Sequence, residues 1–161
     1  MNSELNEFLF FLDACRSGHF DDAEKICALF PELINAQDAK GYAPLIIAAY
    51  NDQPSIVSLL LRNGALPDIQ DASGNTALMG ACFKGYLDVT QQLLAEGADV
   101  NLRNAQNATA LTFAATFGQL AIADLLLQHG ADPDVRDSRG KSPLDHAILQ
   151  ENQEMVDLLN H

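Results

Sequence analysis

Tryptophan is absent from this chain of 161 residues, and basic side chains are scarce, with 9 Lys and Arg against 22 Asp and Glu. The formal net charge of −13 argues against nucleic acid as a main partner, because a phosphate backbone is bound by clustered Lys and Arg. The same charge disfavours an anionic membrane surface. Long hydrophobic runs are also missing, and none approaches the roughly 20 residues of a membrane span. We therefore expect neither a nucleic-acid nor a membrane partner.

Cysteine is rare as well, and its three copies form no recognisable site pattern. Cys15, Cys27 and Cys82 show no C-x-x-C spacing, and an odd number is a poor disulfide framework. Cys15 and Cys27 can approach each other if they lie on a helix pair. The N-terminal residues carry acid where a secretory signal has a basic region. We expect reduced thiols that serve as small apolar core residues in a cytoplasmic protein.

Residues that are able to form a catalytic or metal site are scattered rather than clustered. The four histidines are His19, His129, His146 and His161. His19, Asp21 and Asp22 lie close together in sequence, but a solvated inter-helix turn with an aspartate N-cap explains them better than metal binding. No G-x-S-x-G, P-loop or spaced Cys/His set is present. We expect no enzyme activity, no metal and no cofactor.

The sequence repeats with a period of 33 residues. Turn positions recur at Gly41, Gly74, Asn107 and Gly140. A second glycine, always followed by alanine, recurs at Gly64, Gly97 and Gly130, and a leucine recurs at Leu45, Leu78, Leu111 and Leu144. The chain is therefore one domain of full repeats and two atypical end units. The full repeats are 38–70, 71–103 and 104–136, the N-terminal cap is 1–37, and the shortened C-terminal cap is 137–161.

Each unit reads as a turn followed by two short antiparallel helices, as the 71–103 repeat shows. Gly74 supplies a left-handed turn residue, and Thr76 stands where a helix N-cap belongs. Gly85 ends the first helix, and Gly97 ends the second as a C′ residue. Thr109 and Ser142 are the equivalent N-caps, whereas Ala43 is unable to cap. The aspartates that recur with the period are expected to accept loop hydrogen bonds rather than to bind calcium; they are Asp38, Asp71, Asp99, Asp132 and Asp137.

The end units carry their own patterns. An apolar helical stripe is predicted at Leu5, Phe8, Leu9, Leu12 and Cys15. Phe10 lies off that stripe and is either exposed or covered by the next unit. In the last unit, polar residues stand where the preceding repeat has Phe113, Gly118 and Leu127; they are His146, Glu151 and Asn160. Such substitutions suit a terminal face that meets water.

These motifs resemble those of ankyrin repeats. The T-P-L-H-x-A motif appears as residues 43–48, 76–81, 109–114 and 142–147, and L-L-x-x-G-A-D-x-N appears at 93–101. The resemblance implies an all-α repeat solenoid of helix-turn-helix units with β-hairpin or turn connections, about five units long. The motif histidine is absent and is replaced by Ile46, Met79, Thr112 and Asp145. This loss removes hydrogen bonds that link neighbouring loops in the family.

Function in such a stack is expected at positions that the scaffold leaves free, on the loop tips and the groove-facing ends of the first helices. Tyr50, Phe83 and Phe117 are predicted to form an aromatic band across three repeats, which Tyr86 extends. Exposed aromatics beside lysines are typical of binding hot spots, although the rings are equally able to cover the loops beneath them. The candidate partner-binding residues are Lys40, Tyr42, Tyr50, Asn75, Phe83, Lys84, Tyr86, Phe117, Arg139 and Lys141.

Two functions follow from the resemblance. The first is a monomeric, non-enzymatic protein-interaction module that acts as an adaptor, inhibitor or accessory subunit. The chain resembles short stand-alone ankyrin proteins of bacteria, some of which accompany haem catalases and stress functions. The second function is therefore a carrier of haem or another small ligand, for which Met79 is a weak axial-ligand candidate. Self-association through Phe10 is left open.

Overall fold

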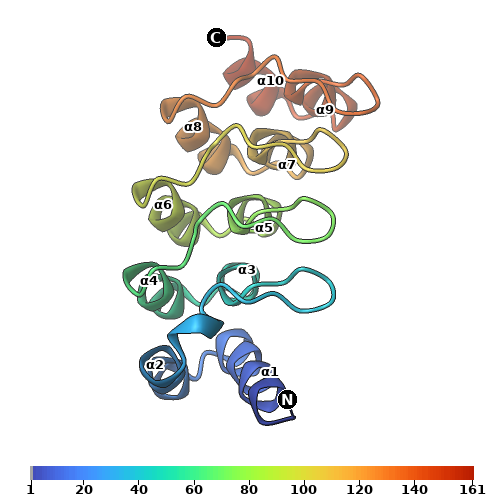
Figure 1. The fold of residues 1–161 in the computed structure, drawn as a ribbon. Helices are drawn as coiled ribbons and strands as arrows, with labels where there is room; N and C mark the ends of the chain where they lie inside the picture. Colours follow the sequence, from blue (N-terminus) through green and yellow to red (C-terminus); the bar gives the residue numbers. More distant parts are fainter. Residues whose placement is uncertain (1) are drawn as a thin grey trace.

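The computed structural model describes residues 2–161, which form a stack of antiparallel helix pairs (Figure 1). The helices are α1 (Asn2–Ser17), α2 (Phe20–Leu29), the 3-10 turn η1 (Pro31–Leu33), α3 (Pro44–Tyr50), α4 (Pro54–Arg62), α5 (Ala77–Lys84), α6 (Leu87–Ala95), α7 (Ala110–Thr116), α8 (Leu120–Gln128), α9 (Pro143–Leu149) and α10 (Gln153–Leu159). No strand occurs within this range. The predicted all-α repeat solenoid is confirmed, with turns rather than strands in the connecting loops.

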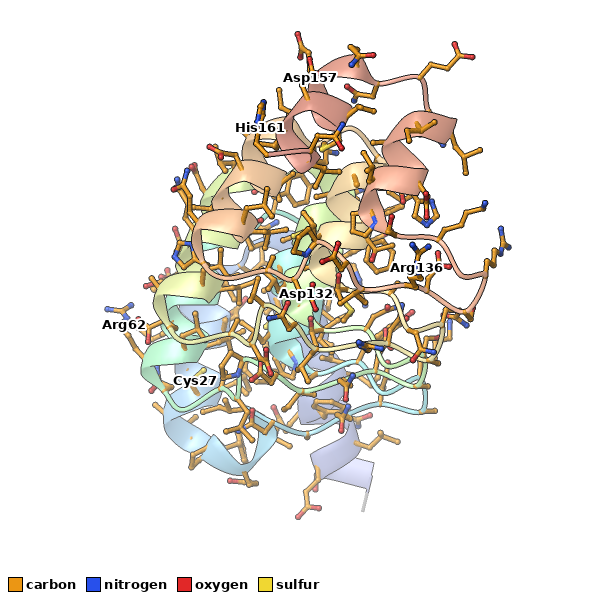
Figure 2. All side chains as sticks on the ribbon, turned by 90° about the horizontal axis from the view of Figure 1, so that it is seen from above. Cys27, Arg62, Asp132, Arg136, Asp157 and His161 are labelled. Atoms are coloured by element: carbon orange, nitrogen blue, oxygen red, sulfur yellow. The ribbon has the colours of Figure 1, made fainter. Side chains whose placement is uncertain are left out.

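The first helices of the units form one layer and the second helices form another, while the loops extend beyond the first layer (Figure 1). Contacts run between neighbouring units, from α3 to α5, from α5 to α7 and from α7 to α9. Viewed along the stack, Arg62 lies on the second-helix side and Arg136 on the loop side (Figure 2). The termini lie at opposite ends of the stack, so each unit buries its apolar face mainly against its neighbours.

The core repeats with the sequence period. Four alanines of the first helices, at the same register, are completely buried; they are Ala48, Ala81, Ala114 and Ala147. Because their side chains are small, adjacent first helices pack closely. The recurring Leu45, Leu78 and Leu111 are buried beside them. One continuous apolar core therefore runs through the stack.

Helix caps form where the sequence places them. The Thr76 hydroxyl accepts a hydrogen bond from the Met79 N–H (3.2 Å), and Thr109 and Ser142 cap their helices in the same way. Ala43 occupies the equivalent position of α3 without a side-chain cap. Asn107 adopts the left-handed conformation predicted for it, with φ of 57°. These turn and cap predictions for the repeats from residue 38 onward are confirmed.

The loops are tied to one another despite the missing motif histidine. The Ala72 N–H donates to the Lys40 carbonyl (2.9 Å), and equivalent backbone bonds link each later loop to the one before it. Within a loop, Asp71 Oδ1 accepts from the N–H groups of Ser73 and Asn75. Asp38, Asn104 and Asp137 make the same turn. The recurrent acids therefore hold the loops, as expected.

The predicted stripe of α1 is partly wrong. Phe8, Leu12 and Cys15 are buried, but the fully buried large side chain is Phe11, while Leu5 and Leu9 are 57% and 53% exposed. Residues at spacings of three and four face the neighbour, and Phe11 belongs to the face of Phe8, Leu12 and Cys15. At 16 residues, α1 is also much longer than the 7-residue α3 beside it, so its first turns are left uncovered. Phe10 is 48% exposed, so of the two alternatives it is the exposed one rather than the one covered by the next unit.

His146 does not meet water as predicted for a terminal face. Its Nε2 lies 2.7 Å from Asp137 Oδ2, and both side chains are mostly covered. Burial alone would raise the pKa of Asp137, but the Lys141 N–H, the His146 ring and the Arg139 N–H outweigh it and hold that pKa below its usual range. The Asp137–His146 contact therefore joins the last loop to α9.

The cysteines lie in the core with free thiols. Burial is the main cause that raises the pKa of Cys15 and of Cys82 to about 12. Since the thiolate is the reactive form, both thiols are poor nucleophiles. Within residues 2–161, no helix combines the length and apolar character needed to cross a bilayer.

Candidate protein-interaction groove

A cavity of about 500 Å³ lies between the loops and the first helices in the N-terminal half of the stack. Residues of α1, α3, α5, α7 and two loops line it; they are Arg16, Tyr42, Ile46, Ile47, Tyr50, Asn51, Asp71, Asn75, Thr76, Met79, Gly80, Phe83 and Phe113. Its volume is within the range of ordinary ligand pockets, roughly 300–1,000 Å³. We call this feature the Gly80 cavity.

The cavity exists because one position in the repeat has no side chain. Gly80 has the same register as Ile47 one repeat before it and Phe113 one repeat after it. All three residues line the cavity, so the glycine forms its floor between two large apolar neighbours. A Cβ atom at position 80 would lie 3.4 Å from Tyr50 Cδ2. The Tyr50 ring thus packs at contact distance over Gly80, on one side of the cavity.

Three rings from successive repeats form the aromatic band, which consists of Tyr50, Phe83 and Phe117. Tyr50 and Phe83 stack with ring centroids 6.2 Å apart, and Phe83 meets Phe117 edge to face at 4.6 Å. Phe83 also contacts Phe113 edge to face at 6.4 Å. Tyr50 is 44% exposed and Phe117 is 49% exposed, whereas Phe83 between them is half-buried. The predicted band is present in the structure.

Positive charge borders the band. Lys84 Nζ lies 5.1 Å from the centroid of the Tyr50 ring, a cation–π geometry. Arg16 lines the cavity and faces Asp13 at 3.6 Å, but both side chains are at least half exposed, so solvent weakens this pair. Asp71, the acidic residue of the lining, uses Oδ1 to accept two loop N–H groups.

The predicted partner-binding residues separate into three groups. Tyr42, Tyr50, Asn75 and Phe83 line the Gly80 cavity, and Lys84 and Phe117 adjoin it through Tyr50 and Phe83. Lys40 lies on the loop that is bonded to Ala72. Arg139 and Lys141 lie on the last loop, outside the cavity lining.

Tyr86 does not extend the band. It is the N-cap residue of α6, is half-buried and packs against the core. Its ring has no aromatic contact among the residues that the structure describes. A position just beyond Gly85 follows the turn away from the first-helix layer, and this change of direction is what the spacing argument overlooked.

Sequence reasoning predicted four of the thirteen lining residues, and Gly80 and Arg16 are instructive among those that it missed. Gly80 was detectable, because it interrupts a register that Ile47 and Phe113 fill with large side chains. Arg16 was not detectable, since it belongs to the first unit, whose helices do not follow the 33-residue period. Its carbonyl accepts a hydrogen bond from Gln53 Nε2, a contact between units that only the fold shows.

The residues around His19 lie outside this groove. They line a second, shallow hollow with Phe20 and Lys25, and His19 is the N-cap of α2 without a side-chain cap bond. Asp21 and Asp22 lie in the first turn of the helix, so the predicted aspartate N-cap is wrong. Carboxylates there are favourable to the helix dipole. No group of three metal-ligating side chains gathers anywhere in the described range.

Comparison with known families gives one match. A family model described as ankyrin repeats in three copies matches residues 11–104 and 81–161. A comparison with curated proteins found no match. Ankyrin repeats generally mediate interactions between proteins.

Proposed function

The chain belongs to the ankyrin-repeat family, and from this premise we propose that it binds another protein along the groove between its loops and first helices. In this proposal the chain catalyses no reaction. It acts as an adaptor, an inhibitor or an accessory subunit, and its effect on the partner comes from binding alone. The residues that carry binding are the aromatic band and the side chains that line the Gly80 cavity.

The observation that supports the proposal most strongly is the exposure of the band. Tyr50 and Phe117 leave nearly half of their surface in water although they flank the half-buried Phe83. Aromatic side chains of this kind, gathered at one place and bordered by cations, are the usual composition of an interface hot spot. The repeated scaffold does not need rings there, because Thr116 and Leu149 occupy the register of Tyr50 and Phe83 in later repeats.

Haem carriage fits these residues poorly. The cavity lining contains no histidine or cysteine, and Met79 is 2% exposed. A haem iron is usually held by His, Cys, Met or Tyr in direct contact with it. Besides the buried Met79, the lining offers only Tyr42 and Tyr50 as such ligands, and the Tyr50 ring already stacks with Phe83 beneath Lys84, so the donor set favours a polypeptide over haem. A haemin titration followed by absorbance is expected to show no saturable change in the Soret band.

The remaining parts of the proposal concern the state of the protein. We infer a monomer in a reducing compartment such as the cytoplasm, which the free, buried thiols of the described chain support. A bacterial source and a role in stress response rest on resemblance alone and stay predictions.

A capture experiment tests the proposed function. Immobilised wild type is compared, in native lysate with mass-spectrometric readout, with a folded Tyr50→Ala, Phe83→Ala, Phe117→Ala variant. The matched control carries Leu29→Ala and Leu66→Ala, which remove exposed apolar side chains of α2 and of the loop after α4. We expect a protein that wild type and control retain and the triple variant loses. Equal retention by all three proteins would contradict the groove as the binding site.

A further inference from the structure

We propose that the Gly80 cavity is a specificity pocket for one large apolar side chain of the partner, and that a carboxylate next to that side chain in the partner binds Lys84 or Arg16. This inference rests on the proposed function and names the chemistry that the groove selects. It assigns the occupant to a polypeptide segment with an apolar residue and an acidic neighbour.

The interrupted register at Gly80 supports an inserted side chain, and the cavity of about 500 Å³ holds that side chain together with neighbouring atoms of the partner. Position 80 is the one place in its register where neighbouring repeats have a large apolar side chain and this repeat has none. The result is a hollow between Ile47 and Phe113, with the Tyr50 ring beside the open Cα of Gly80. Interface hot spots are typically side chains that fill such pockets and are surrounded by a rim that excludes water.

The walls favour an apolar occupant because much of the polar lining already has internal partners. The Thr76 hydroxyl caps α5 and accepts from Met79, and Asp71 Oδ1 accepts two loop N–H groups. Asn51 Nδ2 donates to the Ile47 carbonyl, and Asn75 Oδ1 accepts from Asn104 Nδ2. A polar side chain in the cavity would therefore lose water and find few free hydrogen-bond partners.

The rim favours a carboxylate beside that apolar side chain. Lys84 lies over the Tyr50 ring at one side, and Arg16 lies at another. The negative groups near them are Asp13, paired weakly with Arg16, and Asp71, engaged by its loop. The net charge of −13 repels acid, but at physiological ionic strength salt largely screens the repulsion between charges more than about 8 Å apart. One or two carboxylates in contact with the rim are therefore favoured over a long acidic segment.

A second copy of the chain is the competing occupant. Helix α1 exposes Leu5, Leu9 and Phe10. Glu4 lies beside them, so α1 also offers apolar side chains with an acidic neighbour. Binding of α1 from one copy in the groove of the next would be a head-to-tail contact, which forms a ring if the rotation between copies closes and an open filament if it does not. The competing occupant therefore predicts association that grows with concentration and is lost in Phe10→Ala.

The test uses a displayed library of short random peptides, selected against wild type. Selected peptides are then synthesised and their affinities measured by fluorescence anisotropy against wild type, Gly80→Leu and Lys84→Glu. Leucine at position 80 occupies the part of the cavity next to the Tyr50 ring, which lies 3.4 Å from a Cβ placed there and has to shift slightly to admit the side chain. Ala95→Leu is the matched control, since it adds the same side chain at an exposed position of α6.

We expect a consensus of one large apolar residue with an acidic neighbour. Binding should fall at least tenfold in Gly80→Leu, persist in Ala95→Leu and lose its preference for acid in Lys84→Glu. An absence of selected peptides, a basic consensus or equal binding to Gly80→Leu would overturn the pocket. If the protein self-associates and Phe10→Ala abolishes that association, the groove binds a second copy of the chain, and the proposed pocket for a partner is overturned too.

The pocket and the proposed function fail in distinguishable ways. If Gly80→Leu still captures the native partner and the triple aromatic variant does not, the pocket is wrong and the groove stands. If both variants capture the partner as wild type does, both inferences are wrong. Thermal melts of all variants accompany these measurements, because in Gly80→Leu the gain in helix propensity is opposed by the shift that the Tyr50 ring has to make.

Discussion

At the scale of single residues, one ladder of side chains joins neighbouring units at the ends of the second helices. Asn35 Oδ1 accepts from the Leu66 N–H, and its Nδ2 donates to the Gly64 carbonyl. Two repeats further along the chain, Asn101 makes the same two bonds, accepting from the Asp132 N–H and donating to the Gly130 carbonyl. Asp68 lies 33 residues from each of these asparagines. Its carboxylate accepts from the Asp99 N–H, but its side chain has no N–H to donate to the Gly97 carbonyl.

Asp68→Asn should therefore stabilise the protein. The new amide is placed to donate to the Gly97 carbonyl, and the change also removes one negative charge from a chain of −13. The expected gain in the free energy of unfolding is about 1 kcal/mol, typical of one hydrogen bond. Urea melts at neutral pH measure it, and the reciprocal Asn101→Asp should lose a similar amount. A destabilised Asp68→Asn would contradict the ladder.

The second residue-scale prediction concerns acid. Since the pKa of Asp137 is lowered in the folded state, its contribution to stability is present above the unfolded pKa of about 4 and is lost as pH falls through the lower, folded value. Asp137→Asn keeps the turn, as Asn104 does, but does not titrate. The stability gap between wild type and Asp137→Asn should narrow below about pH 4. If the difference in unfolding free energy between the two proteins were constant from pH 7 to pH 2.5, the lowered pKa of Asp137 would be contradicted.

Single residues were predictable from the sequence where the period governs them. The loop aspartates and the aromatic band follow from a spacing of 33 residues, as the hydrogen bonds and ring contacts show. Arg16 and the partner of His146 were not predictable, because both depend on contacts between segments that the period does not relate. Tyr86 was misplaced for a similar reason, since the turn after Gly85 redirects the chain.

At the scale of elements, the first helices α3, α5, α7 and α9 have nearly the same length, seven or eight residues, but different beginnings. Thr76, Thr109 and Ser142 each cap a helix with a hydroxyl, while α3 begins at Ala43 with no side-chain bond. Pro44 at the first helical position partly compensates, because its fixed φ suits a helix start. Helix α3 should therefore be the least well capped of the four.

Ala43→Ser should strengthen this helix. A serine is already accommodated at the equivalent position 142, where Pro143 follows it as Pro44 follows Ala43. The expected gain is about 1 kcal/mol in the free energy of unfolding. The matched control is Thr76→Ala, which removes a cap and should lower the free energy of unfolding by a similar amount. Urea melts measure both changes. An unchanged Thr76→Ala would show that these caps contribute nothing here.

Element boundaries were predictable because the capping residues and the left-handed turn residues recur. The buried face of α1 was not, since its first turns extend beyond the neighbour that covers the rest of the helix. An amphipathic pattern indicates that a helix has an apolar face, but the neighbouring element decides which part of that face is covered. Leu5 and Leu9 are exposed for this reason.

At the scale of the whole molecule, the stack is stable only as a unit. Helices of seven to nine residues such as α3 and α6 are too short to persist alone in water, so packing between repeats holds them. Leu78→Ala and Leu111→Ala each remove a side chain that is completely buried in the core. Each should cost about 2–5 kcal/mol.

Urea melts followed by circular dichroism measure these losses. Phe117→Ala is the natural comparison, because that ring is 49% exposed and its removal should cost much less. If Phe117→Ala destabilised the protein as much as Leu111→Ala, the ring would be part of the core rather than of an interface.

The central claim is that a protein partner occupies the groove, and photo-crosslinking in the cells that make the protein tests it most directly. A benzoyl-phenylalanine is placed at Phe117, at the edge of the aromatic band, or at Leu66, in the loop after α4, which is 58% exposed. We predict a specific crosslinked protein from position 117 and none from position 66. A partner crosslinked from position 66 and not from position 117 would contradict the account and assign binding to a surface outside the groove.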